Sequence, residues 1–228
     1  MDNSTDNYQP APQVLDRLAQ VDFVAIIGPT AVGKSTLIKS AMQRDPDIHL
    51  VLVNTSRQPR TGEQDGVDYL FKTRPEMEAV IGRREYVQVA PSVLSELYAT
   101  APENYPTSGV AVMAVLAQAI PAFRALPFKT NRSLFILPPS WPEWQQRLVK
   151  HGFTTDHRLK RLAEAKRSLE FALTDTNTAL LVNDDLARAT ALFCDYVAHH
   201  QVTALLAEKR RARQVATDLL GELEKQLN

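Results

Sequence analysis

The sequence predicts an α/β protein in which a parallel sheet is flanked by helices. Five apolar runs are rich in Val, Ile and Leu and are continuous instead of alternating with polar residues. Such runs are typical of strands buried on both faces of a parallel sheet. They cover residues 23–28, 49–54, 109–120, 133–139 and 178–184. Helical patterns lie between the runs, and this alternation favours a wound α/β sheet in three layers.

The length and composition fit one such domain with an appendage. The chain has 228 residues, with 26 Lys and Arg against 26 Asp and Glu. This balance gives no support to nucleic-acid or membrane binding through bulk charge. No apolar run approaches the roughly 20 residues that span a bilayer. The first residues lack a secretory signal, and the single cysteine, Cys194, fits a reducing compartment. We therefore expect a cytoplasmic protein with no nucleic-acid or membrane partner.

Taken in order, the elements predict a main domain over residues 14–203. The polar residues 1–13 are expected to form a disordered N-terminal arm. Residues 55–105 combine turn chemistry, short polar runs and prolines, which indicates an inserted lobe. The short, basic and helical segment 150–165 is typical of a lid. A phase shift in the apolar pattern near 199–202 predicts a separate helical tail over 204–228, which leaves a monomer or a homodimer open.

The first apolar run leads into a phosphate-binding motif. Residues 28–35 satisfy G-x-x-x-x-G-K-[ST], with a strand before them and a helix after them. The glycines let backbone N–H groups surround phosphate oxygens, and the helix N-terminus adds its dipole. Lys34 supplies a charge to the β- and γ-phosphates, and Ser35 is placed to ligate Mg²⁺. The pattern predicts a Mg²⁺–nucleotide site made by Gly28, Pro29, Thr30, Ala31, Val32, Gly33, Lys34, Ser35 and Thr36.

A second candidate anion site lies in "SRQPRTGEQDGVDYLF", residues 56–71. Arg57 and Arg60 follow the second apolar run, at a carboxyl end where ligands bind in open α/β sheets. Each guanidinium is a fork that matches phosphate. Gly62 and Gly66 punctuate the turn that leads to Tyr69, whose hydroxyl can donate a further bond. A switch or motor protein needs one nucleotide site, whereas a kinase of small phosphorylated substrates needs two anion sites.

This segment resembles the acceptor-phosphate segment of the guanylate kinase family, an arginine pair followed nine residues later by a tyrosine. The likeness extends to "FILPPSWPEWQQRL" and "VNDDLARA" and covers roughly residues 22–198. It implies a P-loop NTPase fold with an acceptor-binding lobe and a lid. It also implies ATP and Mg²⁺ as cofactors and phosphoryl transfer to a nucleoside monophosphate, GMP in that family.

The resemblance also implies roles for individual residues around the acceptor. The positions that would hold the acceptor nucleotide are Arg57, Arg60, Tyr69, Gln88, Tyr98 and Thr100. Arg57, together with Lys34, would also stabilise the transferring group.

Around the donor, Asn183 falls where the family contacts the adenine. Arg161 matches a lid arginine that folds onto the transferring phosphoryl group, and Arg158 is a second candidate for that role. A further lid arginine of the family is replaced by His151, or its role is taken by Lys150. Arg147 is open between a functional role and a surface charge of its helix.

Two features depart from the family pattern. The family selects guanine with a carboxylate, and the matching position here is Gln88, with Glu85 three residues earlier. The third strand of the family ends in an acidic D-x-D-x-Q-G pattern, whereas residues 114–119 read AVLAQA and keep only Gln118. Val53 stands where a serine is expected.

Three functions therefore remain open. The first is a nucleoside monophosphate kinase of the guanylate kinase type. The second is a kinase of another phosphorylated acceptor, such as another nucleotide or a sugar phosphate. The third is a non-catalytic binding module with a guanylate kinase-like fold, which the intact Lys34 and Ser35 disfavour.

Overall fold

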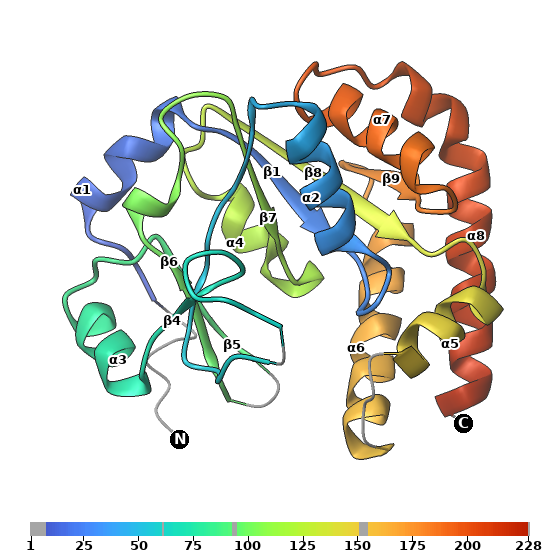
Figure 1. Ribbon diagram of the computed structural model, residues 1–228, viewed down its shortest axis with the longest axis horizontal. Helices are drawn as coiled ribbons and strands as arrows, with labels where there is room; N and C mark the ends of the chain where they lie inside the picture. Colours follow the sequence, from blue (N-terminus) through green and yellow to red (C-terminus); the bar gives the residue numbers. More distant parts are fainter. Residues whose placement is uncertain (1–7, 61, 93–94, 151–154, 228) are drawn as a thin grey trace.

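Two sheets organise the computed structural model, which describes residues 8–60, 62–92, 95–150 and 155–227 (Figure 1). The larger sheet has five parallel strands in the order β2-β7-β1-β8-β9. Its strands are β1 (Asp22–Ile27), β2 (Ile48–Leu50), β7 (Val110–Ala114), β8 (Thr130–Leu137) and β9 (Thr178–Val182). The pairing confirms the predicted parallel α/β sheet, and β1, the strand before the phosphate-binding motif, lies at its centre.

Helices flank this sheet and complete the main body (Figure 1). They are α2 (Lys34–Arg44), α4 (Ile120–Arg124), α5 (Trp141–Lys150), α6 (Thr155–Thr174), α7 (Leu186–Val197) and α8 (Thr203–Leu227). Helix α2 packs against α7, while α8 packs against α6 and β9. Aromatic side chains fill the core beside β1, where Phe23 stacks on Phe128 and Phe123 with ring centroids 4.4 and 5.5 Å apart.

A smaller mixed sheet forms a lobe beside the main body, at the lower left of Figure 1. Its order is β4-β3-β6-β5, and its elements are β3 (Asn54–Thr55), β4 (Leu70–Phe71), α3 (Arg74–Gly82), β5 (Gln88–Pro91), β6 (Leu97–Thr100) and the 3₁₀ turn η2 (Pro102–Asn104). The lobe has a small core of its own, made of Met77, Tyr86, Val89, Leu97, Ala99 and Ala101. We call it the acceptor lobe, and it covers nearly the span expected for an insertion over 55–105.

Two predicted strands end earlier than their apolar runs. In the second run, β2 stops at Leu50, and Asn54 and Thr55 pair within the acceptor lobe instead. In the third run, β7 stops at Ala114, and η3 (Ala117–Ala119) and α4 follow. Pro121 occupies the first turn of α4, a position where its fixed φ and missing N–H favour a helix start.

The two ends of the described chain are more firmly packed than expected. Residues 8–13 are not a disordered arm, because Tyr8 and Ala11 bond to the acceptor lobe; residues 1–7 lie outside the described residues. The chain continues through α1 (Pro12–Leu15) and η1 (Asp16–Gln20) into β1. The break near 199–202 is present between α7 and α8. However, α8 is not a separate tail, because it buries five side chains in the main core: Leu205, Ala212, Ala216, Leu219 and Leu223.

The predicted lid is only partly described. Helix α5 ends at Lys150, residues 151–154 lie outside the described residues, and α6 begins at Thr155. Leu162 and Ala165 of α6 are buried in the main core, so the C-terminal part of the 150–165 segment is a packed helix rather than a free lid. Within the described ranges, no helix is long and apolar enough to cross a membrane.

Candidate functional site

The phosphate-binding loop lies between the end of β1 and the start of α2, and the fold leaves no room for side chains at its glycines. Gly28 and Gly33 have φ values of 145° and 95°, in the region that favours glycine. A Cβ at Gly28 would lie 2.5 Å from the carbonyl oxygen of Ile136 in β8. A Cβ at Gly33 would lie 2.5 Å from Nδ2 of Asn183. The loop is therefore pressed against the neighbouring strand and against the loop after β9.

Lys34 points back into this loop. Its Nζ donates to the carbonyl oxygens of Gly28 and Pro29 at 2.5 and 2.8 Å. Burial lowers the pKa of Lys34 to about 8; the charge of Glu164 acts in the opposite direction, and that of Arg161 lowers it further. The ammonium is thus poorly solvated without a ligand, and an anion in the loop would stabilise its charge. Ser35, the next residue, is exposed in the first turn of α2.

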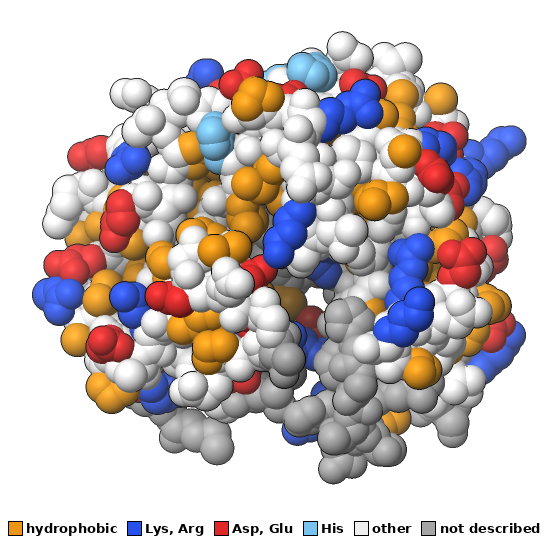
Figure 2. Space-filling view, in the orientation of Figure 1, with side chains coloured by type: hydrophobic (Ala, Val, Ile, Leu, Met, Phe, Trp, Pro, Cys, Tyr) orange, Lys and Arg blue, Asp and Glu red, His pale blue; other side chains and the backbone are white. Residues whose placement is uncertain are grey.

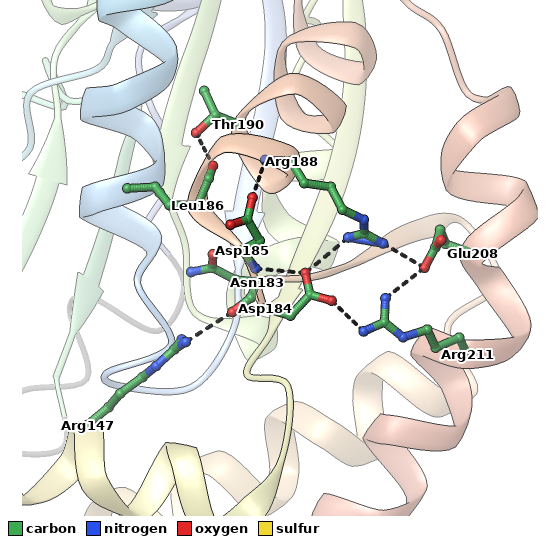
Figure 3. Close-up of polar contacts among 9 residues, drawn as sticks. All are labelled: Arg147, Asn183, Asp184, Asp185, Leu186, Arg188, Thr190, Glu208 and Arg211. Atoms are coloured by element: carbon green, nitrogen blue, oxygen red, sulfur yellow. Dashed lines mark hydrogen bonds and ion pairs between the residues drawn. The ribbon is translucent and has the colours of Figure 1, made fainter.

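Asn183 and Arg147 both bond to the phosphate-binding loop, and Figure 3 shows the bond between the two residues. Asn183 is buried directly after β9, and its Nδ2 donates to the carbonyl oxygen of Val32 at 2.9 Å. Arg147 of α5 donates to the same Val32 oxygen at 3.2 Å and to the carbonyl oxygen of Asn183 at 3.1 Å. Arg147 is therefore not a plain surface charge. Its guanidinium lies against the donor loop.

A charged network fixes the chain directly after Asn183, as Figure 3 shows. The carboxylate of Asp184 accepts from Arg188 of α7 at 3.1 Å and from Arg211 of α8. Glu208 bridges the two arginines, at 2.8 Å to Arg188 and 3.1 Å to Arg211. Burial alone would raise the pKa of Asp184, but the hydrogen bond from Arg211 and the neighbouring charges hold that pKa below its usual value. The network links the loop after β9 to both C-terminal helices.

Three of the predicted acceptor-phosphate residues meet in the acceptor lobe. Arg57 is buried, with 8% of its surface exposed, and its Nε donates to the hydroxyl of Tyr98 at 3.3 Å. Its guanidinium lies over the ring of Tyr69, 5.1 Å from the centroid. Tyr69 and Tyr98 meet edge to face with centroids 6.2 Å apart. We call Arg57, Tyr69 and Tyr98 the arginine–tyrosine cluster.

A carboxylate that the sequence analysis missed occupies the fork of Arg57. Nη1 and Nη2 of Arg57 donate to the two carboxylate oxygens of Glu63, both at 2.9 Å. Burial opposes ionisation of Glu63, but hydrogen bonds from Arg57 and from the main-chain N–H of Arg60 lower its pKa. A bidentate pair of this kind has the geometry with which arginine binds phosphate. Glu63 lies three residues after Arg60 in the same turn, and that spacing could have identified it.

Arg60 joins this arrangement through its backbone. Its N–H donates to Glu63 at 2.8 Å, while its side chain is exposed. The structure thus does not bring the guanidinium of Arg60 into the arginine–tyrosine cluster, where we expected it.

The predicted base-recognition residues lie on paired strands of the lobe. Gln88 of β5 stands opposite Thr100 of β6. Gln88 is half-buried, and its Nε2 donates to the carbonyl oxygen of Val89 at 3.0 Å. Thr100 is buried, and its hydroxyl bonds with that of Tyr105 at 2.9 Å. Glu85 is exposed and pairs with Arg83 at 2.9 Å, so Glu85 does not take the place of Gln88 on β5.

Two of the lid candidates, Arg158 and Arg161, lie on α6, which packs against η3 after β7. Arg161 donates to Glu164 at 2.8 Å, and the charges of both residues act on Lys34. Glu164 and Gln118 line a cavity of about 170 Å³ between α6 and the segment after β7, where the acidic pattern is missing. The side chains of Arg158 and His151 lie outside the described residues, and Lys150 is exposed at the end of α5.

The geometry defines a P-loop nucleotide-binding protein with the arginine–tyrosine cluster on a separate lobe. Figure 2 shows the surface hollowed near the centre of this face, with Lys and Arg side chains at the edge of the hollow.

Comparison with known proteins identifies the family. The sequence model of the family described as "Guanylate kinase" matches residues 20–200. The guanylate kinase of Nostoc sp. is 32% identical over 171 residues, which cover 73% of this chain and 84% of that protein. The guanylate kinase of Clostridium perfringens is 31% identical over 216 residues, which cover 90% of this chain and 92% of that protein. The chain belongs to the guanylate kinase family, and the resemblance predicted from the sequence is confirmed.

A solved structure supports the same fold. The crystal structure of guanylate kinase from Anaplasma phagocytophilum superimposes with a TM-score of 0.59 at 20% identity, covering 84% of this chain and 95% of that one. The P-loop fold with its central parallel sheet is thereby confirmed.

Proposed function

We propose that this protein transfers the γ-phosphoryl group of Mg²⁺–ATP to the phosphate of a nucleoside monophosphate, with GMP as the first candidate acceptor. The observation that carries the proposal is the buried fork of Arg57, which lies on a lobe separate from the phosphate-binding loop. One anion site on the main body and one on the acceptor lobe suit a reaction that transfers a phosphoryl group between two phosphorylated substrates. Family membership supports the same activity.

The proposed chemistry depends on position and charge, and it requires no nucleophile from the protein. Loop N–H groups and Lys34 hold the donor phosphates, and Arg57 with the hydroxyls of Tyr69 and Tyr98 holds the acceptor phosphate. The acceptor replaces Glu63 at the fork of Arg57 or shares the fork with it. Arg161, beside Lys34, stabilises charge on the transferring group when the site closes and water is excluded.

The described residues fit a Mg²⁺ ion that arrives with the nucleotide. The hydroxyl of Ser35 is exposed at the N-terminus of α2, beside Lys34. Within the described ranges, no three His, Cys, Asp or Glu side chains gather closely enough to hold a metal ion. Mg²⁺ commonly keeps several waters and takes its other ligands from phosphates, so Ser35 would supply the protein ligand. When bound, the ion neutralises charge on the β- and γ-phosphates.

Gln88 favours a second candidate, a kinase of another phosphorylated acceptor. Guanine offers two donors, N1–H and the exocyclic amine, where a glutamine presents one acceptor oxygen and one NH₂. The mismatch would weaken guanine binding by about 2–4 kcal/mol in a buried site. A different base or a sugar would not carry this penalty. The intact Lys34 and the closely packed glycines argue against a non-catalytic binding module.

The cellular setting is part of the proposal. An enzyme that consumes ATP would work in the cytoplasm, and the buried Cys194 suits a reducing compartment. We propose a monomer or a homodimer.

A panel of acceptors tests the proposal. The protein is mixed with Mg²⁺–ATP and GMP, AMP, CMP, UMP or sugar phosphates, and ADP release is measured. We expect one nucleoside monophosphate to accelerate ADP release well above the rate with ATP alone. Tight ATP binding without acceleration by any acceptor would favour a binding module and overturn the proposal.

The variant Gln88→Glu identifies the base-reading position in the same assay. A carboxylate accepts both guanine donors, so kcat/KM for GMP should rise about tenfold or more. Glu85→Gln is the matched control, because Glu85 is exposed and pairs with Arg83; its GMP activity should equal that of the wild type. Unchanged or lower GMP turnover in Gln88→Glu would show that another residue reads the base.

A further inference from the structure

Residues 8–21, which we call the tether, bond at their beginning to the acceptor lobe. The hydroxyl of Tyr8 donates to the carbonyl oxygen of Tyr86 at 2.7 Å, and the Tyr8 ring packs against the small core of the lobe. Burial raises the pKa of Tyr8 to about 12, so the hydroxyl keeps its proton at neutral pH. The contact is a hydrogen bond between the tether and the chain just before β5.

Arg84 makes further hydrogen bonds between the lobe and the tether. Its backbone adopts φ = 60°, and its carbonyl oxygen accepts from the N–H of Ala11 at 2.9 Å. Its guanidinium donates to the carbonyl oxygens of Gln9 and Pro10 at 2.8 and 3.3 Å. Main chain and side chain of one residue thus hold three consecutive residues of the tether. A left-handed backbone conformation at a non-glycine residue is unfavourable by about 1 kcal/mol, so the contacts around Arg84 must stabilise it.

The other end of the tether is fixed in the main body. Val14, Leu18 and Val21 are buried in the main core, and Arg17 donates to the carbonyl oxygen of Tyr105 at 3.1 Å. Strand β1 begins at Asp22 and leads directly to the phosphate-binding loop.

Between its two attachments the tether borders a hollow. A cavity of about 600 Å³ is lined by Gln13 and Val14 of the tether and by Asn54, Tyr86 and Ala101 of the lobe, among others. The tether therefore crosses from lobe to body beside a gap, and it does not lie on one continuous packed surface.

We propose that Tyr8 and Arg84 are positioning residues for acceptor recognition. They fix the turn before β5, the strand that carries Gln88, relative to β1 and the donor loop. Apart from the tether, the chain passes between lobe and body at residues 51–53 and 105–109. Lobe and body are also joined by the ion pair of Lys39 with Asp68 at 2.8 Å and by Val87, which is buried in the main core. The tether adds a further connection, which narrows the orientations that the lobe explores, and such preorganisation strengthens binding. Residues 8–19 lie outside the family match at 20–200. The inference rests on the proposed function.

Kinetics of the double variant Tyr8→Phe with Arg84→Ala tests the role. Alanine at position 84 keeps a Cβ, so the backbone strain there is unchanged. We expect KM for the acceptor to rise about threefold to tenfold, equivalent to one or two ordinary hydrogen bonds, with KM for ATP unchanged. Arg84→Lys should restore part of the affinity, because an ammonium can still donate to one carbonyl. Arg83→Ala is the matched control, since Arg83 is an exposed neighbour paired with Glu85; it should behave as the wild type.

Two outcomes would overturn the proposal. An unchanged acceptor KM would mean that the tether does not position the lobe. A parallel rise of both KM values with a lower Tm would mean that the contacts only stabilise the fold. Amide hydrogen exchange separates this inference from the proposed activity: the double variant should exchange faster over residues 84–91, and not in β1, even if no acceptor is turned over. Equal exchange in variant and wild type would also overturn it.

Discussion

The charge of Lys34 should depend on pH near neutrality, because the side chain is buried in its own loop. Burial lowers its pKa to about 8, so the free protein loses this charge as the pH rises from 7 to 9. Bound phosphates favour the charged form and therefore require the proton. The affinity for Mg²⁺–ATP should fall about tenfold between pH 7 and 9, since about a tenth of the free protein is protonated at pH 9.

Isothermal titration at several pH values measures this effect. Lys34→Arg stays charged at pH 9 and should give a flat profile. Lys39→Arg changes an exposed lysine of the same helix and should keep the wild-type slope. A wild-type affinity that is constant from pH 7 to 9 would contradict the assignment.

Single residues differ in how far the sequence alone could place them. The place of the phosphate-binding loop was predictable from the glycine and lysine spacing, and the structure puts it between β1 and α2 as expected. Arg57, Tyr69 and Tyr98 were placed by resemblance, and the structure brings them together. Glu63 was missed, although it lies in the same turn as Arg60 and fills the fork of Arg57 six residues earlier. Arg147 was left open, because it reaches two carbonyl oxygens on other segments.

Helix α8 is the element whose role the sequence left most open. Its apolar positions predicted an amphipathic helix but did not identify the surface that it covers. In the structure it packs on α6 and β9, its Arg211 pairs with Asp184, and its Glu208 pairs with Arg188 of α7. Exposed ion pairs of this kind contribute little, about 1 kcal/mol or less each, so the buried leucines must supply most of its attachment.

The variant Leu219→Ala tests this attachment. Leu219 is 1% exposed, so its truncation should lower the free energy of unfolding by about 2–5 kcal/mol. Leu206 of the same helix is 59% exposed, and Leu206→Ala should change it by no more than about 0.5 kcal/mol. Urea unfolding followed by circular dichroism measures both. Equal effects, or a separate early transition of α8, would mean that the helix is not part of the main core.

Element boundaries were the weaker part of the sequence prediction, for a physical reason. The run 49–54 has a continuous apolar stretch at 50–53, yet its last residue, Asn54, pairs with β6 of the acceptor lobe and not with β7. An apolar stretch indicates that its residues are buried, but it does not indicate which of the two sheets they belong to. Only the three-dimensional pairing divides the run between them.

At the scale of the whole molecule, the two proposed anion sites lie on bodies that must approach one another for the transfer to occur. The phosphate-binding loop belongs to the five-stranded sheet, and the arginine–tyrosine cluster belongs to the four-stranded sheet. In-line transfer requires reacting atoms about 3–3.5 Å apart, so the acceptor lobe and the main body should close when both nucleotides are present. Electron–electron distances between spin labels measure this closure.

One label at Glu78→Cys on α3 and another at Lys209→Cys on α8 report on the two bodies; both positions are exposed, and the native Cys194 is buried. The distance should shorten with ADP and the acceptor together, and less with either alone. The control pair Gln43→Cys and Lys209→Cys lies within the main body and should not change. If all distances stayed constant with both ligands bound, the two sites would not converge by lobe movement, and one of the two anion sites would be misassigned.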